Sequence, residues 1–170
     1  LPPPDDERDL SHLHVVVEQL KAAGYARYEI SNFAHPGEVS RHNLAYWRDA
    51  DWVGLGAGAH SHVAGMRWKN VDDPAAYAGA IEAEGTAVEW TETPPPDVAL
   101  FDALMMGLRL AEGVDLDRLQ QTYAIDVRVA HGRWLEQMMN EGLVVLEGPT
   151  MKLTTRGFDL ANHVIGGFLP

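Results

Sequence analysis

Apolar positions along the first 34 residues change from a helical to an extended spacing. The apolar side chains after the opening prolines recur at steps of three and four residues, at Leu10, Leu13, Val16, Val17 and Leu20. This spacing predicts a helix, with Asp5 and Asp6 as caps and Gly24 as its end. The alternating segment 25–34 then predicts one strand, which the Pro36–Gly37 turn ends. Helix followed by strand is typical of the later part of an α/β fold.

Residues 51–62 predict a second strand with an unusual composition. Glycine occupies every second position at Gly54, Gly56 and Gly58, so in an extended chain one face of the strand carries no side chains. Two interpretations stay open from the residues alone. The bare face packs against a crowded interior or a large side chain, or a flat ligand lies against its backbone. The spacing does not fit a dinucleotide-binding fingerprint.

The next segments predict a hairpin, a helix and a linker. The hairpin over 62–71 turns at Ala64 and Gly65, and the helix begins at Pro74 and ends at Gly85. Three consecutive prolines follow in the segment 87–98, which is the best linker in the chain. We therefore expect a domain boundary near Thr91, between domains 1–90 and 91–170.

The second domain is predicted to be mostly helical. Its apolar periodicity predicts helices over 97–110, 115–123 and 127–140, two strands in 143–154, and a final helix over 154–169. Three helices, a hairpin and a helix make a winged-helix-like domain. From Asp97 to the end, ten acidic side chains face six lysines and arginines. This balance favours a packing or interaction module over DNA binding.

Composition and charge exclude several classes of function. The chain has 170 residues, 46% of them hydrophobic, which fits a folded globular protein. No segment has the length and apolarity of a membrane span or signal peptide, so a cytoplasmic location is expected. The net charge of -12 disfavours nucleic acid as a partner. Cysteine is absent, which excludes thiolate metal sites in this chain. The start at Leu1, without methionine, favours a fragment.

The eight histidines are the first candidates for chemistry. Hydrogen-bonded or solvated structural roles are expected for four of them, namely His12, His14, His131 and His163. His35 precedes a proline in a turn. His60 and His62 share one face of an extended chain and suit a metal, although no local carboxylate or thiolate completes the site. His60 also lies where the carboxyl end of a strand is predicted, the place where α/β ligand crevices open.

The segment SRHNLAYW, residues 40–47, carries a different set of side chains. It is predicted to connect a turn and a strand, outside any helical or strand pattern. In one interpretation His42 ligates haem iron, Tyr46 and Trp47 stack on a porphyrin, and Asn43 orients the imidazole or binds a propionate. In the other, the two aromatic residues are core anchors and Asn43 forms a turn. From the residues alone, the second interpretation is favoured.

Several segments in this order resemble a known family. YEISNFAHPGEVSRHNLAYW is followed by GLGAGAHS, then by MRWKN, and then by MGLRLAEGVD. Together they resemble the carboxyl-terminal portion of the HemW-type haem chaperone and oxygen-independent coproporphyrinogen III oxidase-like family of radical S-adenosylmethionine proteins. The resemblance runs through essentially the whole chain, and the HNxxYW element of the chaperone group is intact.

This resemblance implies a fold and two ligand sites. The fold is the last part of an incomplete β/α barrel followed by a winged-helix-like domain. The haem-binding residues are His42, Asn43, Tyr46 and Trp47, with His42 as the iron ligand. The S-adenosylmethionine-binding residues are Gly56, Gly58, Ala59 and His60, which gives the glycine face a reason. No catalytic or metal-ligating residue is assigned to this chain.

The absence of cysteine departs from the family's three-cysteine motif for a [4Fe-4S] cluster. We therefore expect cluster binding and radical chemistry to belong to the intact protein. The expected function is haem binding and delivery to a target protein. The alternative is oxygen-independent oxidation of coproporphyrinogen III, a radical decarboxylation in porphyrin biosynthesis. A third possibility makes the last domain a protein or nucleic-acid adaptor, the latter disfavoured by its charge.

Overall fold

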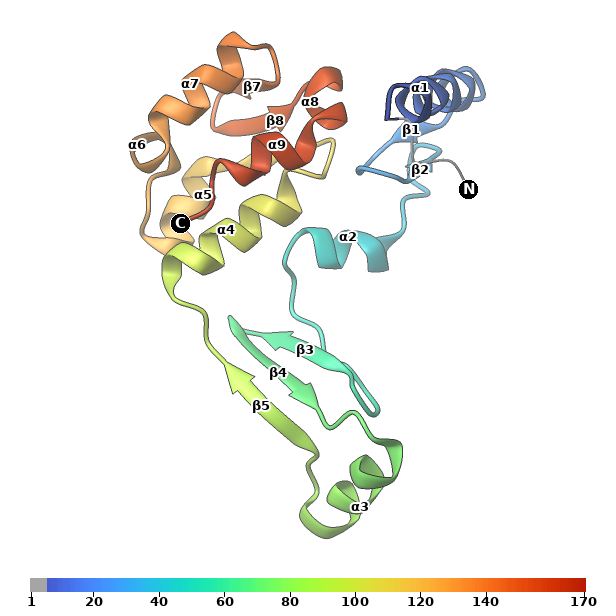
Figure 1. The fold of residues 1–170 in the computed structure, drawn as a ribbon, viewed down its shortest axis with the longest axis vertical. Helices are drawn as coiled ribbons and strands as arrows, with labels where there is room; N and C mark the ends of the chain where they lie inside the picture. The colour runs from blue at the N-terminus through green and yellow to red at the C-terminus, as the bar shows by residue number, and fades with distance from the viewer. Residues whose placement is uncertain (1–5) are drawn as a thin grey trace.

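The structure is a computed structural model that describes residues 6–170. Its elements form three regions (Figure 1): a helix with a small hairpin, a three-stranded sheet with its own helix, and a helical carboxyl-terminal region. The short helix α2 lies between the three regions. Of the two acidic caps predicted for the first helix, Asp5 lies outside the described residues and Asp6 is the first helical residue.

The first region begins with the predicted helix. Helix α1 spans Asp6–Ala22, and the chain leaves it at Gly24 with a positive φ of 87°. The prediction of one strand over 25–34 is wrong. This segment folds back on itself as strands β1 (Ala26–Arg27) and β2 (Phe33–Ala34), paired antiparallel. A turn in which the Tyr28 amide donates to the Asn32 carbonyl at 3.1 Å makes this possible.

The middle region is an antiparallel sheet in the order β3-β4-β5. The elements are β3 (His60–Val63), β4 (Met66–Asn70), helix α3 (Pro74–Glu84) and β5 (Val88–Glu92). The predicted hairpin is confirmed, with positive φ at both Ala64 and Gly65. Helix α3 begins at Pro74 and ends at Gly85, as predicted. Thr91 lies inside β5, so the boundary proposed near it falls in a paired strand rather than in a loop.

The prediction of one strand over 51–62 is also wrong. Only Trp52 and β3 pair in this segment, and the residues between them form an irregular loop. Gly56 and Gly58 have φ of 102° and 69°, a backbone conformation that favours glycine and does not occur in a strand. Gly54 is excluded from carrying a side chain for another reason, since a Cβ there would lie 2.0 Å from the His60 carbonyl oxygen.

The carboxyl-terminal region has the predicted winged-helix-like order, with three differences. Its elements are α4 (Pro96–Gly107), β6 (Val114–Asp115), α5 (Leu116–Tyr123), α6 (Val127–Ala130), α7 (Gly132–Asn140), β7 (Val144–Glu147), β8 (Thr150–Leu153), α8 (Thr155–Asp159) and α9 (Ala161–Gly166). The helix predicted over 127–140 breaks at His131, and the final helix breaks at Leu160. Strand β6 was not predicted, and it pairs with β8 on the edge opposite β7.

The hydrophobic core lies almost entirely in this carboxyl-terminal region. Fully buried side chains come from several of its elements and include Leu104, Leu116, Val127, Met138, Met151 and Val164. Before Pro94, the buried apolar side chains of the described residues are Leu44 and Ala87. The first two regions therefore depend on contacts with the carboxyl-terminal region for their positions.

The fold is mixed α/β, and the barrel is not closed. Every strand pairing in residues 6–170 is antiparallel. None of the described helices is long and apolar enough to cross a bilayer.

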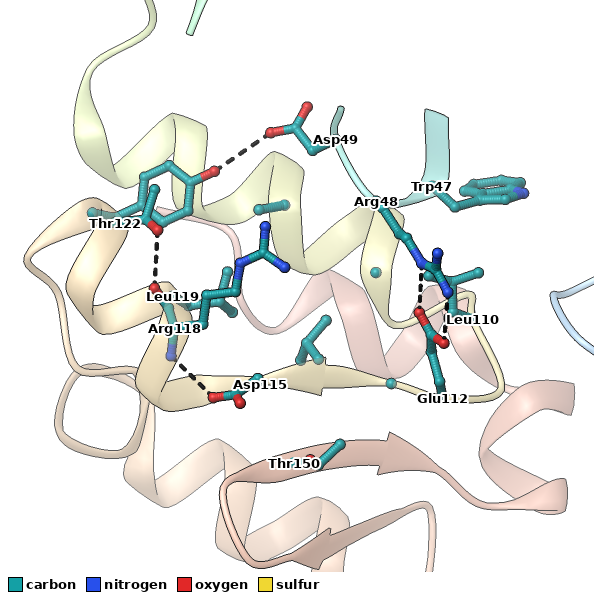
Figure 2. Close-up of a pocket in the computed structure, with 15 residues that line it drawn as sticks. Trp47, Arg48, Asp49, Leu110, Glu112, Asp115, Arg118, Leu119, Thr122 and Thr150 are labelled. Atoms are coloured by element: carbon teal, nitrogen blue, oxygen red, sulfur yellow. Dashed lines mark hydrogen bonds and ion pairs between the residues drawn. The ribbon is translucent and has the colours of Figure 1, made fainter. Parts of the chain in front are cut away.

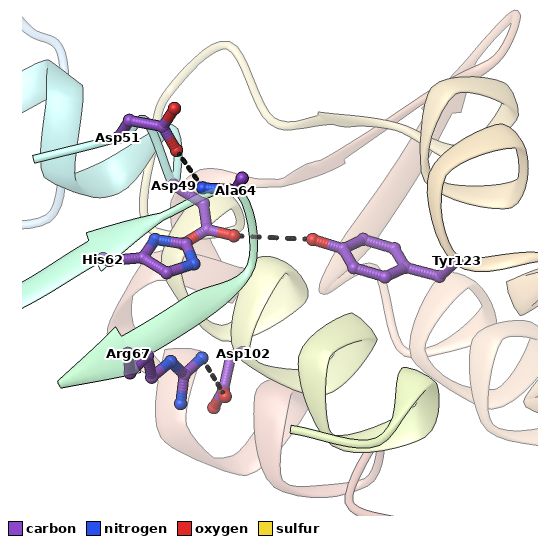
Figure 3. Close-up of polar contacts among 7 residues, drawn as sticks. All are labelled: Asp49, Asp51, His62, Ala64, Arg67, Asp102 and Tyr123. Carbon is purple, nitrogen blue, oxygen red and sulfur yellow. Dashed lines mark hydrogen bonds and ion pairs between the residues drawn. The ribbon is translucent and has the colours of Figure 1, made fainter. Parts of the chain in front are cut away.

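Polar contacts join the middle region to the carboxyl-terminal region (Figure 3). The Tyr123 hydroxyl donates to Asp49 Oδ2 at 3.4 Å, and Asp49 Oδ1 lies 3.2 Å from Nδ1 of buried His62. Among residues 6–170 that nitrogen makes no hydrogen bond, so the two groups lie close together without a directed bond. Beside them, Arg67 of β4 pairs with Asp102 of α4 at 2.7 Å. Burial raises the pKa of Tyr123, and the neighbouring Asp49 raises it further.

A close backbone approach in the core provides a first prediction. A Cβ at Gly157 would lie 2.0 Å from the Leu143 carbonyl oxygen, whereas a Cβ at Gly132 would meet nothing within 4 Å. We expect Gly157→Ala to lower the free energy of unfolding in urea by about 1 to 3 kcal/mol, because neither backbone can move freely. Gly132→Ala, also in a helix, is the control and should not destabilise the protein. Equal stability of the two variants would contradict the close approach.

The partly buried position of Asp49 predicts a pH-dependent stability. Burial raises its pKa above the ordinary value of 3.8, while His62 and Arg67 oppose the shift. The folded protein therefore binds the Asp49 proton more tightly than the unfolded chain does. This stabilisation is complete below pH 3.8 and is lost as the pH rises through the folded pKa.

At pH 7 the ionised carboxylate consequently costs stability, and Asp49→Asn should unfold at higher urea concentration than the wild type. Asparagine also tolerates the φ of 52° at this position. The difference should shrink as the pH falls towards 4 and the wild-type carboxyl becomes neutral. Urea titrations at pH 7, 6, 5 and 4 measure it, with Asp51→Asn as the control for losing one charge in the same loop. A difference that stays constant with pH would contradict the assignment.

Candidate functional site

The segment SRHNLAYW forms a helix, contrary to the prediction of a connecting segment. Helix α2 spans Arg41–Trp47 and is capped by Ser40, whose hydroxyl accepts from the Asn43 amide at 3.2 Å. Serine is a favoured residue at this position because it satisfies an amide that has no partner inside the helix. Leu44 is buried, and α2 packs against α4. With seven residues, the helix is too short for its apolar periodicity to be recognised in the sequence.

His42 and Tyr46 lie one turn apart on the exposed face of α2. Their ring centroids are 5.0 Å apart and nearly perpendicular, with an interplanar angle of 83°. This is the edge-to-face arrangement that aromatic rings prefer. Within residues 6–170, His42 makes no hydrogen bond or ion pair, so both nitrogens of its exposed imidazole are available to a ligand.

Asn43 and Trp47 lie on a different face of the same helix, turned towards the protein. The side-chain nitrogen of Asn43, Nδ2, donates to the Tyr28 hydroxyl at 3.3 Å. Trp47 is half-buried, and the Arg109 guanidinium lies 5.9 Å from the centre of its ring. The indole nitrogen of Trp47 is buried without a hydrogen-bond partner. The four residues predicted to bind haem are thus divided between two faces of α2.

A row of aromatic rings extends from the exposed face of α2 into the protein. Tyr46 contacts Trp52 edge-on at 5.3 Å, and Trp52 contacts His62 at the same distance. His62 in turn lies against Asp49. This row joins the exposed His42 to the polar contacts that connect the middle and carboxyl-terminal regions.

The residues predicted to bind S-adenosylmethionine lie in and after the glycine loop. The Gly58 backbone amide donates to the Val71 carbonyl, and the Asn70 side-chain nitrogen Nδ2 donates to the Gly56 carbonyl, both at 2.9 Å. Ala59 is half-buried, and His60 is exposed with its ring 5.8 Å from that of Trp90. In the described part of the chain, no hydrogen bond, ion pair or ring contact joins this group to the four α2 residues.

A cavity of about 380 Å³ lies where α2 ends against the carboxyl-terminal region (Figure 2). Trp47 borders it from α2, and Leu110, Val114 and Leu119 supply apolar walls. The Arg48 guanidinium at its edge is engaged by both carboxylate oxygens of Glu112, at 2.8 and 2.9 Å. Of the four haem-binding candidates, only Trp47 therefore borders this half-polar cavity, and His42 does not.

Four of the other histidines have structural partners. His14 contacts Asp159 of α8 at 3.0 Å, and His35 contacts the Gly24 carbonyl at 3.1 Å. His131 and His163 lie edge-on to Phe168 and Trp134. Across residues 6–170, no three histidine or carboxylate side chains are grouped as metal ligands.

Two residues of the site were not found in the sequence, Tyr28 and Trp52. Tyr28 is fifteen positions from its partner Asn43, and no local periodicity connects them. Trp52 falls in a segment that was interpreted as a strand. An aromatic residue shortly after Tyr46 and Trp47 was the available signal for Trp52, but its partner His62 becomes adjacent only through the isolated bridge between them.

Comparisons with known proteins agree with this architecture. Residues 95–160 match the HemN C-terminal domain family. The chain is 32% identical over 169 residues to "Heme chaperone HemW" of Bacillus subtilis, covering 99% of this chain and 44% of the relative. It is 35% identical over 163 residues to the protein of the same name from Mycobacterium tuberculosis strain H37Rv, covering 95% and 40%. The chain thus spans less than half the length of these curated relatives.

A solved structure supports the fold over nearly the whole chain. It is described as coproporphyrinogen III oxidase (HemN) from Escherichia coli, a radical SAM enzyme, and it superposes with a TM-score of 0.73 at 18% identity. The match covers 97% of this chain and 42% of that one. Another relative, "Radical S-adenosyl methionine domain-containing protein 1, mitochondrial" of Dictyostelium discoideum, is 27% identical over 187 residues, covering 96% of this chain and 42% of the relative. The chain therefore belongs to the HemW and HemN family of radical SAM proteins, and it matches the carboxyl-terminal portion of that family.

Proposed function

We propose that this chain is part of a haem chaperone, a protein that binds haem and passes it to a target protein in the cytoplasm. The observation that carries the proposal is the exposed His42 imidazole, which has no hydrogen bond or ion pair in residues 6–170 and stands edge-on to Tyr46. A neutral imidazole is a common ligand of haem iron, and an aromatic ring beside it suits the flat porphyrin. Relatives named "Heme chaperone HemW" support the same function.

The chemistry of the site suits transfer of haem rather than permanent retention. His42 lies on the surface, and its neighbour Tyr46 is 37% exposed. A ligand held at such a position keeps one side open to a partner protein. We infer that the exposed face of α2 presents haem, and that the acceptor protein approaches this face.

We also propose that the glycine loop contributes to S-adenosylmethionine binding in the intact protein. Gly56, Gly58, Ala59 and His60 are the candidate residues, with one exposed imidazole beside two positive-φ glycines. Membership of a radical SAM family supports this role. Cluster ligands are not among the residues of this cysteine-free chain, so we assign the [4Fe-4S] cluster to the remainder of the intact protein.

The assignment of His42 predicts the outcome of a haem titration. Adding haem to the wild-type chain should shift the Soret band, and His42→Ala should weaken binding by at least about tenfold because the iron loses its ligand. His60→Ala is a matched control, since His60 is also exposed and edge-on to an aromatic ring. Equal titration of the wild type and His42→Ala, or a loss confined to His60→Ala, would refute the role of His42.

The second candidate function is oxygen-independent coproporphyrinogen III oxidase activity. The observation that favours it is the superposition on Escherichia coli HemN with a TM-score of 0.73. If the chaperone proposal is right, the full-length protein should not decarboxylate coproporphyrinogen III under anaerobic conditions. Incubation with S-adenosylmethionine and a reductant, followed by separation of the porphyrins, tests this expectation. Escherichia coli HemN is the positive control, and product formation by the full-length protein would favour the oxidase.

A further inference from the structure

We propose that Asn43 is a positioning residue, which fixes the rotation of α2 through Tyr28 so that His42 and Tyr46 together face outward. This inference rests on the proposed function of His42 as a haem ligand, and it assigns Asn43 a role other than contact with haem. The observation that supports this inference is the hydrogen bond from the Asn43 side-chain nitrogen Nδ2 to the Tyr28 hydroxyl at 3.3 Å.

Helix α2 cannot set its own orientation. It has seven residues, about two turns, and a helix of this length is not stable without tertiary contacts. Its side chains one turn apart form two rows, with His42 and Tyr46 in one row and Asn43 and Trp47 in the other. Because the two rows share one rigid backbone, a contact that fixes the second row also fixes the first.

The partner of Asn43 is itself held firmly. The Tyr28 amide donates to the Asn32 carbonyl within the hairpin, and the Tyr28 carbonyl accepts from the Ala111 amide at 3.0 Å. Ala111 follows Leu110, which belongs to the carboxyl-terminal core and forms a bridge with Glu29. The backbone of Tyr28 is thus attached beside a buried residue of the carboxyl-terminal region. Asn43 connects α2 to that fixed point.

The placement of the Asn43 side chain argues against contact between Asn43 and a haem propionate. A carboxylate accepts hydrogen bonds, and the NH2 group, with two N–H bonds, is the only donor group of an asparagine side chain. In the structure this group lies on the half-buried face of α2, where one of its N–H bonds donates to the Tyr28 hydroxyl. His42, by contrast, has its imidazole on the exposed face. A ligand meeting His42 therefore approaches α2 from a side that Asn43 does not face.

Four variants of the 170-residue chain test the inference by haem titration. Asn43→Ala and Tyr28→Phe each break the hydrogen bond, and each should weaken haem binding by about three- to tenfold. The double variant should be no weaker than either single one, because the same contact is lost. The Soret maximum at saturation should stay at the wild-type position, since His42 still ligates the iron. Tyr25 is a neighbouring exposed tyrosine whose hydroxyl makes no hydrogen bond within residues 6–170. Tyr25→Phe removes this hydroxyl and should bind haem like the wild type.

Asn43→Asp distinguishes positioning from propionate contact. An aspartate at this position can accept a hydrogen bond from the Tyr28 hydroxyl, so positioning predicts affinity within about twofold of the wild type, lost again when combined with Tyr28→Phe. Contact with a propionate predicts the reverse, because two carboxylates repel each other and Asn43→Asp then binds more weakly than Asn43→Ala. That reverse order, together with unchanged binding by Tyr28→Phe, would overturn the inference.

A second measurement separates this inference from the proposed function. If His42→Ala leaves the haem titration unchanged, the function assigned to His42 is wrong, whatever Asn43 does. The role of the Asn43–Tyr28 hydrogen bond is then tested through the imidazole proton resonances of His42 in the haem-free chain. They should move in Asn43→Ala and Tyr28→Phe and stay close to the wild type in Asn43→Asp and Tyr25→Phe. Resonances unaffected by the loss of the bond would show that Asn43 does not position His42.

Discussion

The arrangement of the candidate site depends on Tyr28, which joins three parts of the chain at one point. Its backbone closes the hairpin turn and accepts from Ala111 next to the core, while its hydroxyl accepts from Asn43 of α2. Its bonds add to a small number of apolar contacts in this part of the chain, because the buried apolar side chains lie almost entirely beyond Pro95. The first part of the chain is thus positioned by directed polar bonds more than by hydrophobic packing.

The polar joint at Asp49 has a different character. Its carboxylate is ionised at neutral pH in a partly buried position, where burial raises the pKa, and it has only His62, Arg67 and the Tyr123 hydroxyl to compensate. Such a contact specifies how the regions meet without adding much stability. It also lies at the end of the ring row that begins at His42. A change in the angle between the regions would therefore displace Trp52 and Tyr46.

Sequence patterns predicted the elements whose signals are local. Helix α5 and the hairpin turn at Ala64 and Gly65 follow from apolar periodicity and turn chemistry within a few residues. The hairpin at 26–34 and strand β6 did not, because two-residue strands gain their identity only from partners. The alternation of glycine gave the pattern expected of a strand, although Gly56 and Gly58 occupy loop positions with positive φ. A period-two pattern of glycine therefore indicates a loop as readily as a bare strand face.

The same limit applies to the site. The identity of the haem-binding candidates was available from the motif, but their division between two faces was not, since α2 is too short for a recognisable periodicity. That division changes what the motif means. A spacing of HNxxYW places histidine and tyrosine in one row of a helix and asparagine and tryptophan in the next. If the outer row meets the ligand and the inner row sets the rotation of the helix, all four positions are constrained, although only two of them contact haem.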